Sequence, residues 1–273
     1  MTNGSATASA HARLEVASLW IGKELDWLHQ LCLASFVHHG HKVTVFYDGT
    51  DVAPVVPDGV DTVPAAEVWD RKAHGHGKAP ASMVSDLFRL YLLKQTPMMW
   101  VDCDVLCVQP LPDDPFHIGK EHGGMVNGAV LRLPPESATL NQLIDWFEDP
   151  HFVPHWLNDA QQAKVDAAEP GNRLETAFRL VRPAVGPRAL RHTIRAMKED
   201  NHLRRPEVYY PVRGVYSDVF FNPHGGAEES LSFDTLTVHL YASMIRPFHT
   251  KHMPAKSSFI AQYAREIGFD IAV

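Results

Sequence analysis

The chain has little cysteine and no excess of positive charge. Its 273 residues include three cysteines, Cys32, Cys103 and Cys107. An odd number of cysteines in apolar surroundings does not fit a disulfide framework, so we expect reduced, buried thiols and a reducing compartment. The formal net charge of −7 argues against nucleic-acid binding through bulk electrostatics, because no basic field would attract a polyanion.

The chain also lacks a long apolar run. No stretch approaches the roughly 20 apolar residues that a membrane-spanning helix needs. The N-terminal stretch "MTNGSATASAHARLEV" has no basic segment followed by an apolar core, which argues against a secretory signal. We therefore expect a cytoplasmic protein without a transmembrane segment. Peripheral contact with the inner face of a membrane stays open, since it needs only a surface patch.

The composition is that of a folded protein. Hydrophobic residues make up 45% of the chain and charged residues 21%, which suits one large α/β domain or two small ones. Residues 1–14 are small and polar, so we expect a disordered lead-in there. The remainder, 15–273, is predicted to form a single domain.

The first apolar segments indicate a parallel sheet. "VASLWIG" (16–22) is a short apolar run typical of a buried strand, and "KVTVFYDG" (42–49) is rich in β-branched and aromatic residues. The segment from Glu24 to His38 between them has apolar residues at helical spacing. Strand, helix and strand at this length form a βαβ unit, which predicts an α/β fold.

The rest of the chain continues this pattern. Further strands are expected near Val60–Val63 and at 98–108, 123–133, 207–212 and 236–241, and further helices at 81–95, 136–147, 155–168, 172–181, 187–199 and 256–267. Residues 136–200 therefore read as a helical insertion in an otherwise mixed α/β sheet.

Two aspartates stand one residue apart in "WVDCDVLC" (100–107). Residues i and i+2 of a strand point to the same face, so Asp102 and Asp104 are expected to lie side by side near the carboxyl end of the strand, where open α/β sheets bind ligands. Adjacent carboxylates repel each other, and a divalent cation such as Mg²⁺ or Mn²⁺ relieves that repulsion. The simpler alternative is a pair of aspartates that cap a turn in solvent.

The helix before this strand carries three more polar residues. In "SDLFRLYLLK" the charged residues Asp86 and Arg89 are three positions apart, so they share a helix face, and Ser85 precedes them. An ordinary surface salt bridge, worth little to stability, is the alternative for this pair.

Taken together, "SDLFRLYLL", a short connection and an apolar strand ending in "DCD" resemble a known sugar-transferase region with a DXD motif. That region is shared by glycosyltransferase family 32, the α-1,4-galactosyltransferases and the glucosylating domains of large clostridial toxins. Weaker similarities occur in the same order at "LWIG" (19–22), "NGAVLRLP" (127–134), "GPRAL" (186–190), "YYP" (209–211) and "VHLY" (238–241).

The resemblance implies a GT-A-like, Rossmann-type mixed sheet with helices on both faces. It implies a metal-dependent hexosyltransferase, using Mn²⁺ or Mg²⁺, that moves a sugar from a nucleotide-diphosphate donor, with UDP favoured and the anomeric configuration retained. The acceptor class stays open among glycans, lipid-linked molecules and small molecules, as in polysaccharide biosynthesis.

The resemblance also implies residue roles. Asp104 would bind the metal directly, Asp102 would contact the donor and metal-bound water, and His239 would approach the metal or the diphosphate. Asn127 would offer its amide dipole to the oxocarbenium-like sugar beside Gly128. The implied donor-binding residues are Trp20, Ile21 and Gly22 at the base and ribose, Ser85 at the nucleotide, and Asp86 and Arg89 at the sugar hydroxyls.

Two positions depart from the resembling families. Gln95-Thr96-Pro97 stands where those families have Gly-Gly, which changes only a turn. Ala242 stands where they often have asparagine, so the choice between His239 and Ser243 as the last metal ligand is open.

Two other functions compete with the transferase. A nucleotide-sugar-binding protein without transferase activity would explain Ala242. A haloacid-dehalogenase-type phosphatase also uses an Asp-x-Asp strand end, but it expects Thr or Val where this chain has Leu106.

For the aromatic residues of the helical insertion, among them Trp146 and Trp156, core packing is the default and an acceptor platform the alternative. Arg188, Arg213 and Arg246 are interpreted as surface charges rather than phosphate contacts.

Overall fold

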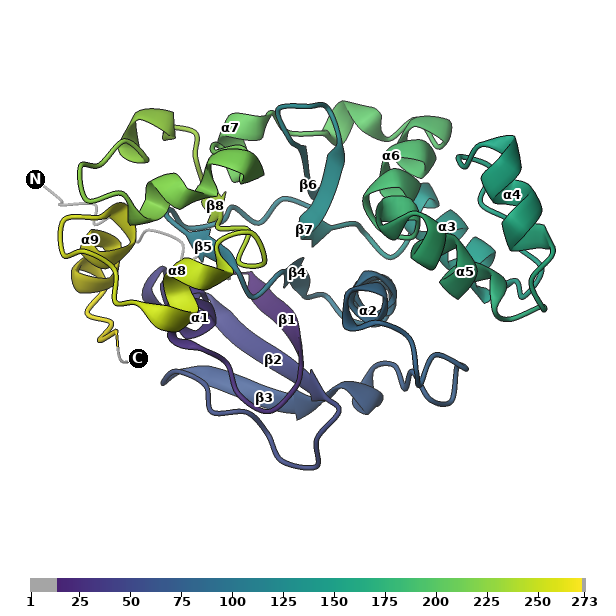
Figure 1. Cartoon of the computed structure of the whole chain (residues 1–273), viewed down its shortest axis with the longest axis horizontal. Coiled ribbons are helices and arrows are strands. Elements are labelled where there is room, and N and C mark those ends of the chain that lie inside the picture. Colours follow the sequence, from purple (N-terminus) through teal and green to yellow (C-terminus); the bar gives the residue numbers. More distant parts are fainter. Residues whose placement is uncertain (1–13, 272–273) are drawn as a thin grey trace, which may run out of the picture.

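A six-stranded mixed sheet forms the centre of the molecule (Figure 1). The computed structural model describes residues 14–271. The sheet has the order β3-β2-β1-β4-β7-β6, in which the first four strands are parallel and β7 and β6 each run antiparallel to the preceding neighbour. The strands are β1 (Glu15–Ile21), β2 (Lys42–Asp48), β3 (Val60–Pro64), β4 (Met99–Val101), β6 (His117–Lys120) and β7 (Val126–Arg132).

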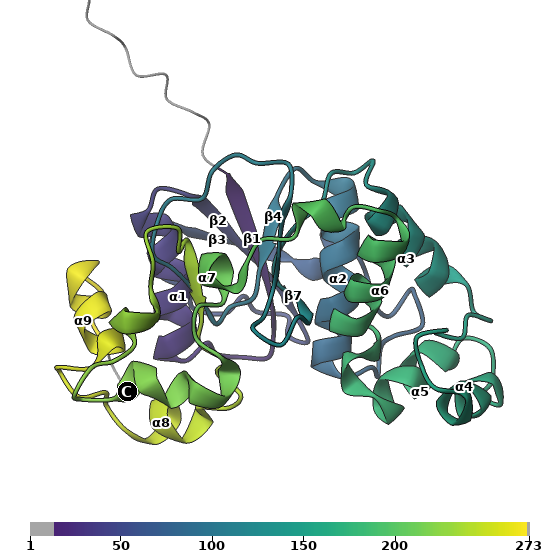
Figure 2. The same cartoon turned by 90° about the horizontal axis from the view of Figure 1, so that it is seen from above.

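Helices cover both faces of this sheet, because successive strand residues point to opposite sides. Val43 and Val45 of β2 pack with Phe36 of α1 (Trp27–His38). Phe46 points the other way and packs with Phe88 of α2 (Ala81–Gln95). Figure 2 shows the sheet edge-on between α1 and α2. The expected fold class, a mixed α/β sheet with helices on both faces, is confirmed.

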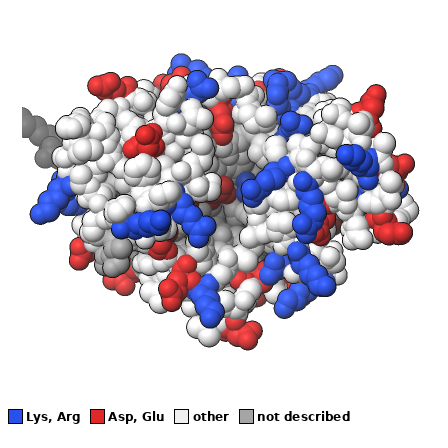
Figure 3. Space-filling view, viewed as in Figure 1, with Lys and Arg blue, Asp and Glu red and all other residues white. Residues whose placement is uncertain are grey.

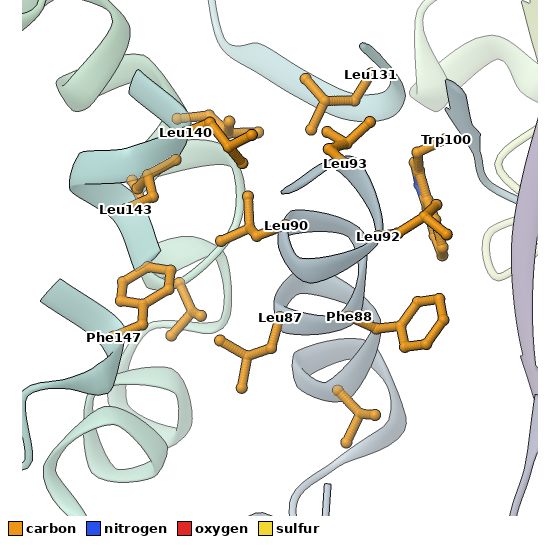
Figure 4. Packing of buried hydrophobic residues seen from close by; sticks show 14 of the residues in the cluster. Leu87, Phe88, Leu90, Leu92, Leu93, Trp100, Leu131, Leu140, Leu143 and Phe147 are labelled. Atoms are coloured by element: carbon orange, nitrogen blue, oxygen red, sulfur yellow. The ribbon is translucent and has the colours of Figure 1, made fainter. Parts of the chain in front are cut away.

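The expected helical insertion lies on the far side of α2 from the sheet. Its helices are α3 (Ala138–Glu148), α4 (Asp159–Asp166), α5 (Arg173–Leu180) and α6 (Pro187–Ala196). Leu87 and Leu90 of α2 point toward Leu143 and Phe147 of α3, whereas Phe88 of the same helix points toward the sheet (Figure 4). Helix α2 is therefore buried on two sides and joins the sheet to these helices.

The C-terminal segment returns to the opposite side of the molecule (Figure 1). It holds α7 (Pro206–Tyr209), β8 (Thr237–His239), α8 (Arg246–Lys251) and α9 (Phe259–Glu266). Short 3₁₀ turns occur along the whole chain, at 65–67, 182–184, 200–202, 214–221 and 228–230. Strand β8 pairs antiparallel with β5 (Val105–Cys107) in a separate two-stranded sheet. Val238 and Leu240 pack in one cluster with Leu28 of α1.

Two expected strands are wrong. The run 98–108 is two strands, because the chain turns at Asp102 and the Val105 amide donates to the Asp102 carbonyl at 3.1 Å. The run 207–212 begins as helix α7, because Pro206 occupies the first helical position, where its fixed φ and missing N–H are tolerated. An apolar run shows burial but not the sheet to which each part belongs.

Three other expectations from the sequence can be compared with the structure. The three cysteines are free and buried, as expected. The lead-in expected at residues 1–14 lies, except for Leu14, outside the described residues. Between residues 14 and 271, none of the helices is both long and apolar enough to cross a membrane.

Candidate metal and donor site

The turn between β4 and β5 carries both aspartates of the Asp-x-Asp sequence. The Asp102 amide donates to the Ala129 carbonyl on β7 at 2.8 Å, and the Leu240 amide donates to the Asp104 carbonyl at 2.9 Å. The turn is thus fixed to the main sheet on one side and to the segment after β8 on the other. We expected strand alternation to set the two side chains on one face, and this is wrong, because both aspartates lie in the turn between the strands and not within a strand.

Asp102, Asp104 and His239 meet at this turn. One ligand atom from each lies within 4.8 Å of the others, which makes them a candidate metal site within the described residues. The Nε2 atom of His239 is 3.3 Å from Oδ1 of Asp104. Two carboxylates and an imidazole are donors that suit Mn²⁺, and Mg²⁺ accepts the carboxylates. The residues therefore fit the expected cofactor. Ser243 is exposed, and the choice between His239 and Ser243 as the last ligand stays a prediction.

Burial and charge have opposite effects on the pKa values of Asp104 and His239. Burial raises the pKa of the Asp104 carboxyl, but His239 and the amide of Ala242 outweigh burial and hold that pKa well below its usual range. Burial lowers the pKa of His239, but the Asp104 carboxylate reverses the effect, and the net pKa is raised. The side chains therefore favour an imidazolium beside a carboxylate, and a divalent cation would take the place of that proton.

The residues after His239 shape this site through the backbone. Tyr241 has a φ of 53°, a left-handed conformation that bulky residues rarely adopt. Its ring stacks on His239 with centroids 3.9 Å apart, and the next amide, of Ala242, donates to Oδ2 of Asp104 at 2.9 Å. The Nδ1 atom of His239 is buried without a hydrogen-bond partner among residues 14–271. Position 242 thus reaches Asp104 through its backbone, not through a side chain.

Arg89 joins this turn to α2 and β7. Its guanidinium donates to the Gly128 carbonyl at 2.7 Å, lies 3.3 Å from a carboxylate oxygen of Asp86 and 3.3 Å from one of Asp102, and sits over the Trp100 ring. The side chain is 8% exposed and that of Asp86 is 12% exposed. The expected pairing of Asp86 with Arg89 is therefore present, and it is a buried pair rather than a surface salt bridge.

Asp86 is held in an environment that disfavours its charge. Burial raises the pKa of Asp86 to about 6, although the neighbouring Arg89 pulls it down. An ideal Cβ built on Gly186, just before α6, would lie 2.5 Å from both carboxylate oxygens. The Ser85 hydroxyl accepts from Arg89 at 3.2 Å. All three residues expected from "SD…R" thus lie in one contact group.

Asn127 and Gly128 lie on β7 across from this group. The Asn127 amide nitrogen donates to Glu121 at 2.5 Å and its oxygen accepts from the Ala129 amide at 2.8 Å. A Cβ on Gly128 would lie 2.6 Å from a guanidinium nitrogen of Arg89, so a larger residue there would require Arg89 to shift. Glu121 also accepts from the Tyr241 hydroxyl at 3.4 Å. The sequence carries no signal for Glu121, which lies before the strand.

The end of β1 supplies the residues expected at the nucleotide base. Trp20, Ile21 and Gly22 are half-buried, and the Trp20 indole nitrogen is buried without a hydrogen-bond partner among the described residues. Gly22 has a φ of 145°, which favours glycine, and a Cβ there would lie 3.7 Å from that nitrogen. The donor-binding role of these three residues stays a prediction.

A second cluster next to this site was not expected. Asp26 caps α1, and its two carboxylate oxygens lie 2.6 Å from Nδ1 of His29 and 2.9 Å from Nδ1 of His249. Burial raises the pKa of Asp26, but hydrogen bonds from the two histidines hold it well below its usual range. His249 also contacts the Ala242 carbonyl at 3.2 Å. An aspartate before an apolar helix signals a cap, but nothing in the sequence links it to His249.

The molecule is hollowed in the middle of the face shown in Figure 3. Acidic atoms are visible inside the hollow, and Lys and Arg side chains gather along the rim formed by the helical insertion. This distribution suits an anionic ligand bound through a cation at an acidic floor.

No protein-family model and no curated protein matches the chain. Among the solved structures that resemble it are two glycosyltransferases. The first, PaToxG glycosyltransferase, is 12% identical, and the match covers 70% of this chain and 78% of that one at a TM-score of 0.37. The second, the apo structure of the WbbM bifunctional glycosyltransferase, is 10% identical, and the match covers 94% of this chain and 50% of that one at a TM-score of 0.39. Likeness at these TM-scores assigns neither an activity nor a donor.

Proposed function

We propose that the chain is a GT-A-type, metal-dependent glycosyltransferase that uses a nucleotide-diphosphate sugar. The observation that carries the proposal is the convergence of Asp102, Asp104 and His239 within 4.8 Å, from two segments far apart in the sequence. The buried Asp86–Arg89 pair touches the same turn. The sequence resemblance to DXD-containing transferases predicts this combination.

The chemistry follows from the charges. Departure of a sugar from a nucleoside diphosphate builds negative charge on the β-phosphate, and a bound Mn²⁺ or Mg²⁺ would supply Lewis-acid neutralisation of that charge. Asp104 and His239 would hold the ion, and Asp102 would orient the donor beside it. Asp86 would accept a hydrogen bond from a sugar hydroxyl, and Arg89, 3.3 Å from its carboxylate, would fix its position.

The finer assignments belong to the same proposal. We favour UDP as the nucleotide, retention of configuration, and a cytoplasmic site of action on a glycan, lipid-linked or small-molecule acceptor. The Asn127 amide is held by Glu121 and by the Ala129 amide. Its proposed stabilisation of the developing positive charge therefore comes from a fixed dipole that needs no reorganisation.

A thermal-shift series with UDP-sugars tests the proposal. Wild-type protein is expected to gain stability from a UDP-sugar only when Mn²⁺ is present, because a ligand that binds only the folded state stabilises it by mass action. Asp104→Asn should abolish the Mn²⁺-dependent shift. Asp61→Asn, on the exposed face of β3, is the matched control and should keep it. A shift that survives in Asp104→Asn would refute the assigned ligand.

A turnover assay on wild-type protein distinguishes a transferase from a binding protein. A transferase is expected to release UDP from a UDP-sugar that raises its thermal midpoint, when a broad panel of acceptors is present. Binding with Mn²⁺ but no turnover would favour the nucleotide-sugar-binding alternative. Position 242 supports that alternative, since it contributes no side-chain ligand.

A further inference from the structure

A basic pocket opens beside α6. It has a volume of about 600 Å³, and its lining includes Met125, Trp156, Arg188, Arg191, His192 and Arg195. The three arginines are three and four positions apart, so they lie on one side of the helix. Arg188 and Arg191 are half-buried, and Arg195 is exposed.

The arginines of this pocket have no acidic partner in the described part of the chain. Other arginines pair with carboxylates, for example Arg132 with Asp113 at 2.7 Å and Arg173 with Asp166 at 2.9 Å. The chain as a whole carries a net charge of −7. Three uncompensated arginines in one pocket of an acidic protein provide a local positive field without internal neutralisation.

An aromatic wall completes the pocket. The Trp156 ring packs on His192 with centroids 5.2 Å apart, and its indole nitrogen donates to the Ala184 carbonyl at 2.9 Å, which fixes the ring. Nε2 of His192 lies 2.7 Å from Nε2 of His155. A fixed indole offers a flat apolar surface, and arginine forks match phosphate oxygens. A ligand with a ring and a phosphate would use both.

One edge of the pocket, at Met125, lies close in sequence to the candidate donor site. Helix α6 begins after Gly186, which packs against the Asp86 carboxylate, and an ideal Cβ on Gly128 would lie 3.0 Å from Leu190 of the same helix. Met125 is two residues before Asn127. Gly186 and Leu190 lie on the buried face of α6, whereas the three arginines lie on its outer side, so Met125 is the lining residue that connects the pocket to the β7 residues of the candidate site.

We propose that this pocket binds a phosphate group carried by the acceptor. The inference rests on the proposed transferase function for its acceptor role. Arg188 and Arg191 hold the phosphate, Arg195 attracts it from solvent, and Trp156 contacts the adjoining ring. The same chemistry would serve a soluble phosphorylated sugar or a phosphorylated lipid headgroup. It makes Arg188 a ligand-binding residue rather than a surface charge.

Calorimetric titration of the full chain tests the inference, with glucose 6-phosphate and glucose as probes. Wild type should bind glucose 6-phosphate and not glucose. The double variant Arg188→Gln/Arg191→Gln should bind at least about tenfold more weakly, because each substitution removes a charge-assisted hydrogen bond. Arg182→Gln, exposed on the same group of helices but outside the pocket, should bind as wild type does.

Vesicle sedimentation separates the two sources of phosphate. Binding to phosphatidic acid vesicles but not to phosphatidylcholine vesicles, lost in the double variant, supports a lipid headgroup. Glucose 6-phosphate binding without vesicle binding supports a soluble acceptor. The inference is overturned if wild type binds neither glucose 6-phosphate nor phosphatidic acid vesicles. It is also overturned if the double variant binds both of these ligands as wild type does.

The donor site is measured in parallel. UDP with Mn²⁺ should bind wild type and the double variant alike. Retained UDP binding without phosphate binding overturns this inference alone. Absent UDP binding in wild type overturns the proposed function, whatever the phosphate titration gives. The thermal midpoint of each variant, compared with wild type, confirms that the substitutions leave the fold intact.

Discussion

The carboxylate of Asp86 occupies the space that a Cβ on Gly186 would need. An ideal Cβ at Gly186 would come within 2.5 Å of both carboxylate oxygens, closer than non-bonded atoms approach. The helical insertion therefore contacts the α2 residues of the candidate site through a position that only glycine can fill without displacing Asp86.

Gly186→Ala should destabilise the protein by about 1–3 kcal/mol, the usual cost of overpacking a buried contact. It should also weaken UDP-sugar binding, because Asp86 must move. Urea unfolding measures the first effect and the Mn²⁺-dependent thermal shift the second. Gly123→Ala is the control, since a Cβ there meets nothing within 4 Å. Equal stability of the two variants would contradict the contact.

Asp86 should make stability depend on pH. Its pKa is about 6 in the folded protein, above its ordinary value of 3.8, so the folded state binds more protons than the unfolded state between these values. Stability should therefore fall as pH rises from about 4 to 6, by at most about 3 kcal/mol. Asp86→Asn should remove this part of the decline. Parallel pH profiles of the two proteins would show that Asp86 does not titrate in this window.

The contact between Asp26 and His249 should stabilise the fold over a limited pH range. The pKa of Asp26 is depressed, so its contribution is present above about pH 4 and is lost as pH falls through the folded value. Burial lowers the pKa of His249, but Asp26 raises it above its ordinary value of 6.5, so its contribution is full below that value and lost as pH rises through the folded one.

Asp26→Asn should therefore cost about 2 kcal/mol near pH 5–6 and clearly less at pH 9. Asparagine still caps α1, so the difference reports the charge and not the cap. Guanidinium unfolding at several pH values measures it. A cost that is independent of pH would argue against the ionic contact.

Arg89→Gln should be far more damaging than loss of an exposed arginine. It leaves Asp86 without its cation and removes the donor to the Gly128 carbonyl, at a cost of about 3–5 kcal/mol. Arg179 forms an exposed pair with Glu175 at 2.5 Å. Arg179→Gln should change the free energy of unfolding by less than about 0.5 kcal/mol. Similar losses in the two variants would mean that the buried network around Arg89 contributes little.

Local patterns predicted much of the first half of the fold. The β1–α1–β2 unit and α2 follow from apolar spacing, and the Gly, Pro and Asp-Gly signals mark their ends. The break after Val101 was missed because Val105 and Cys107 are as apolar as Met99 and Val101. Their partner strand, β8, is remote in the sequence, so only tertiary pairing divides the run.

The contacts within the candidate site could be predicted where side chains lie close in sequence or share a motif, and the roles of those residues stay predictions. Asp86 with Arg89 follows from helical spacing, and His239 from the resemblance. Glu121, His249 and the Ala242 amide act through long-range contacts with Asn127, Asp26 and Asp104. No local pattern encodes such contacts.

The origin of the three candidate metal ligands has a consequence for synthesis of the chain. Asp102 and Asp104 emerge from the ribosome well before His239, and the β5–β8 pairing that brings His239 to them needs the C-terminal segment. A nascent chain that stops before β8 presents only two carboxylates of the candidate site to a cation. Full affinity for an ion at the candidate metal site would therefore begin only after β8 has been synthesised.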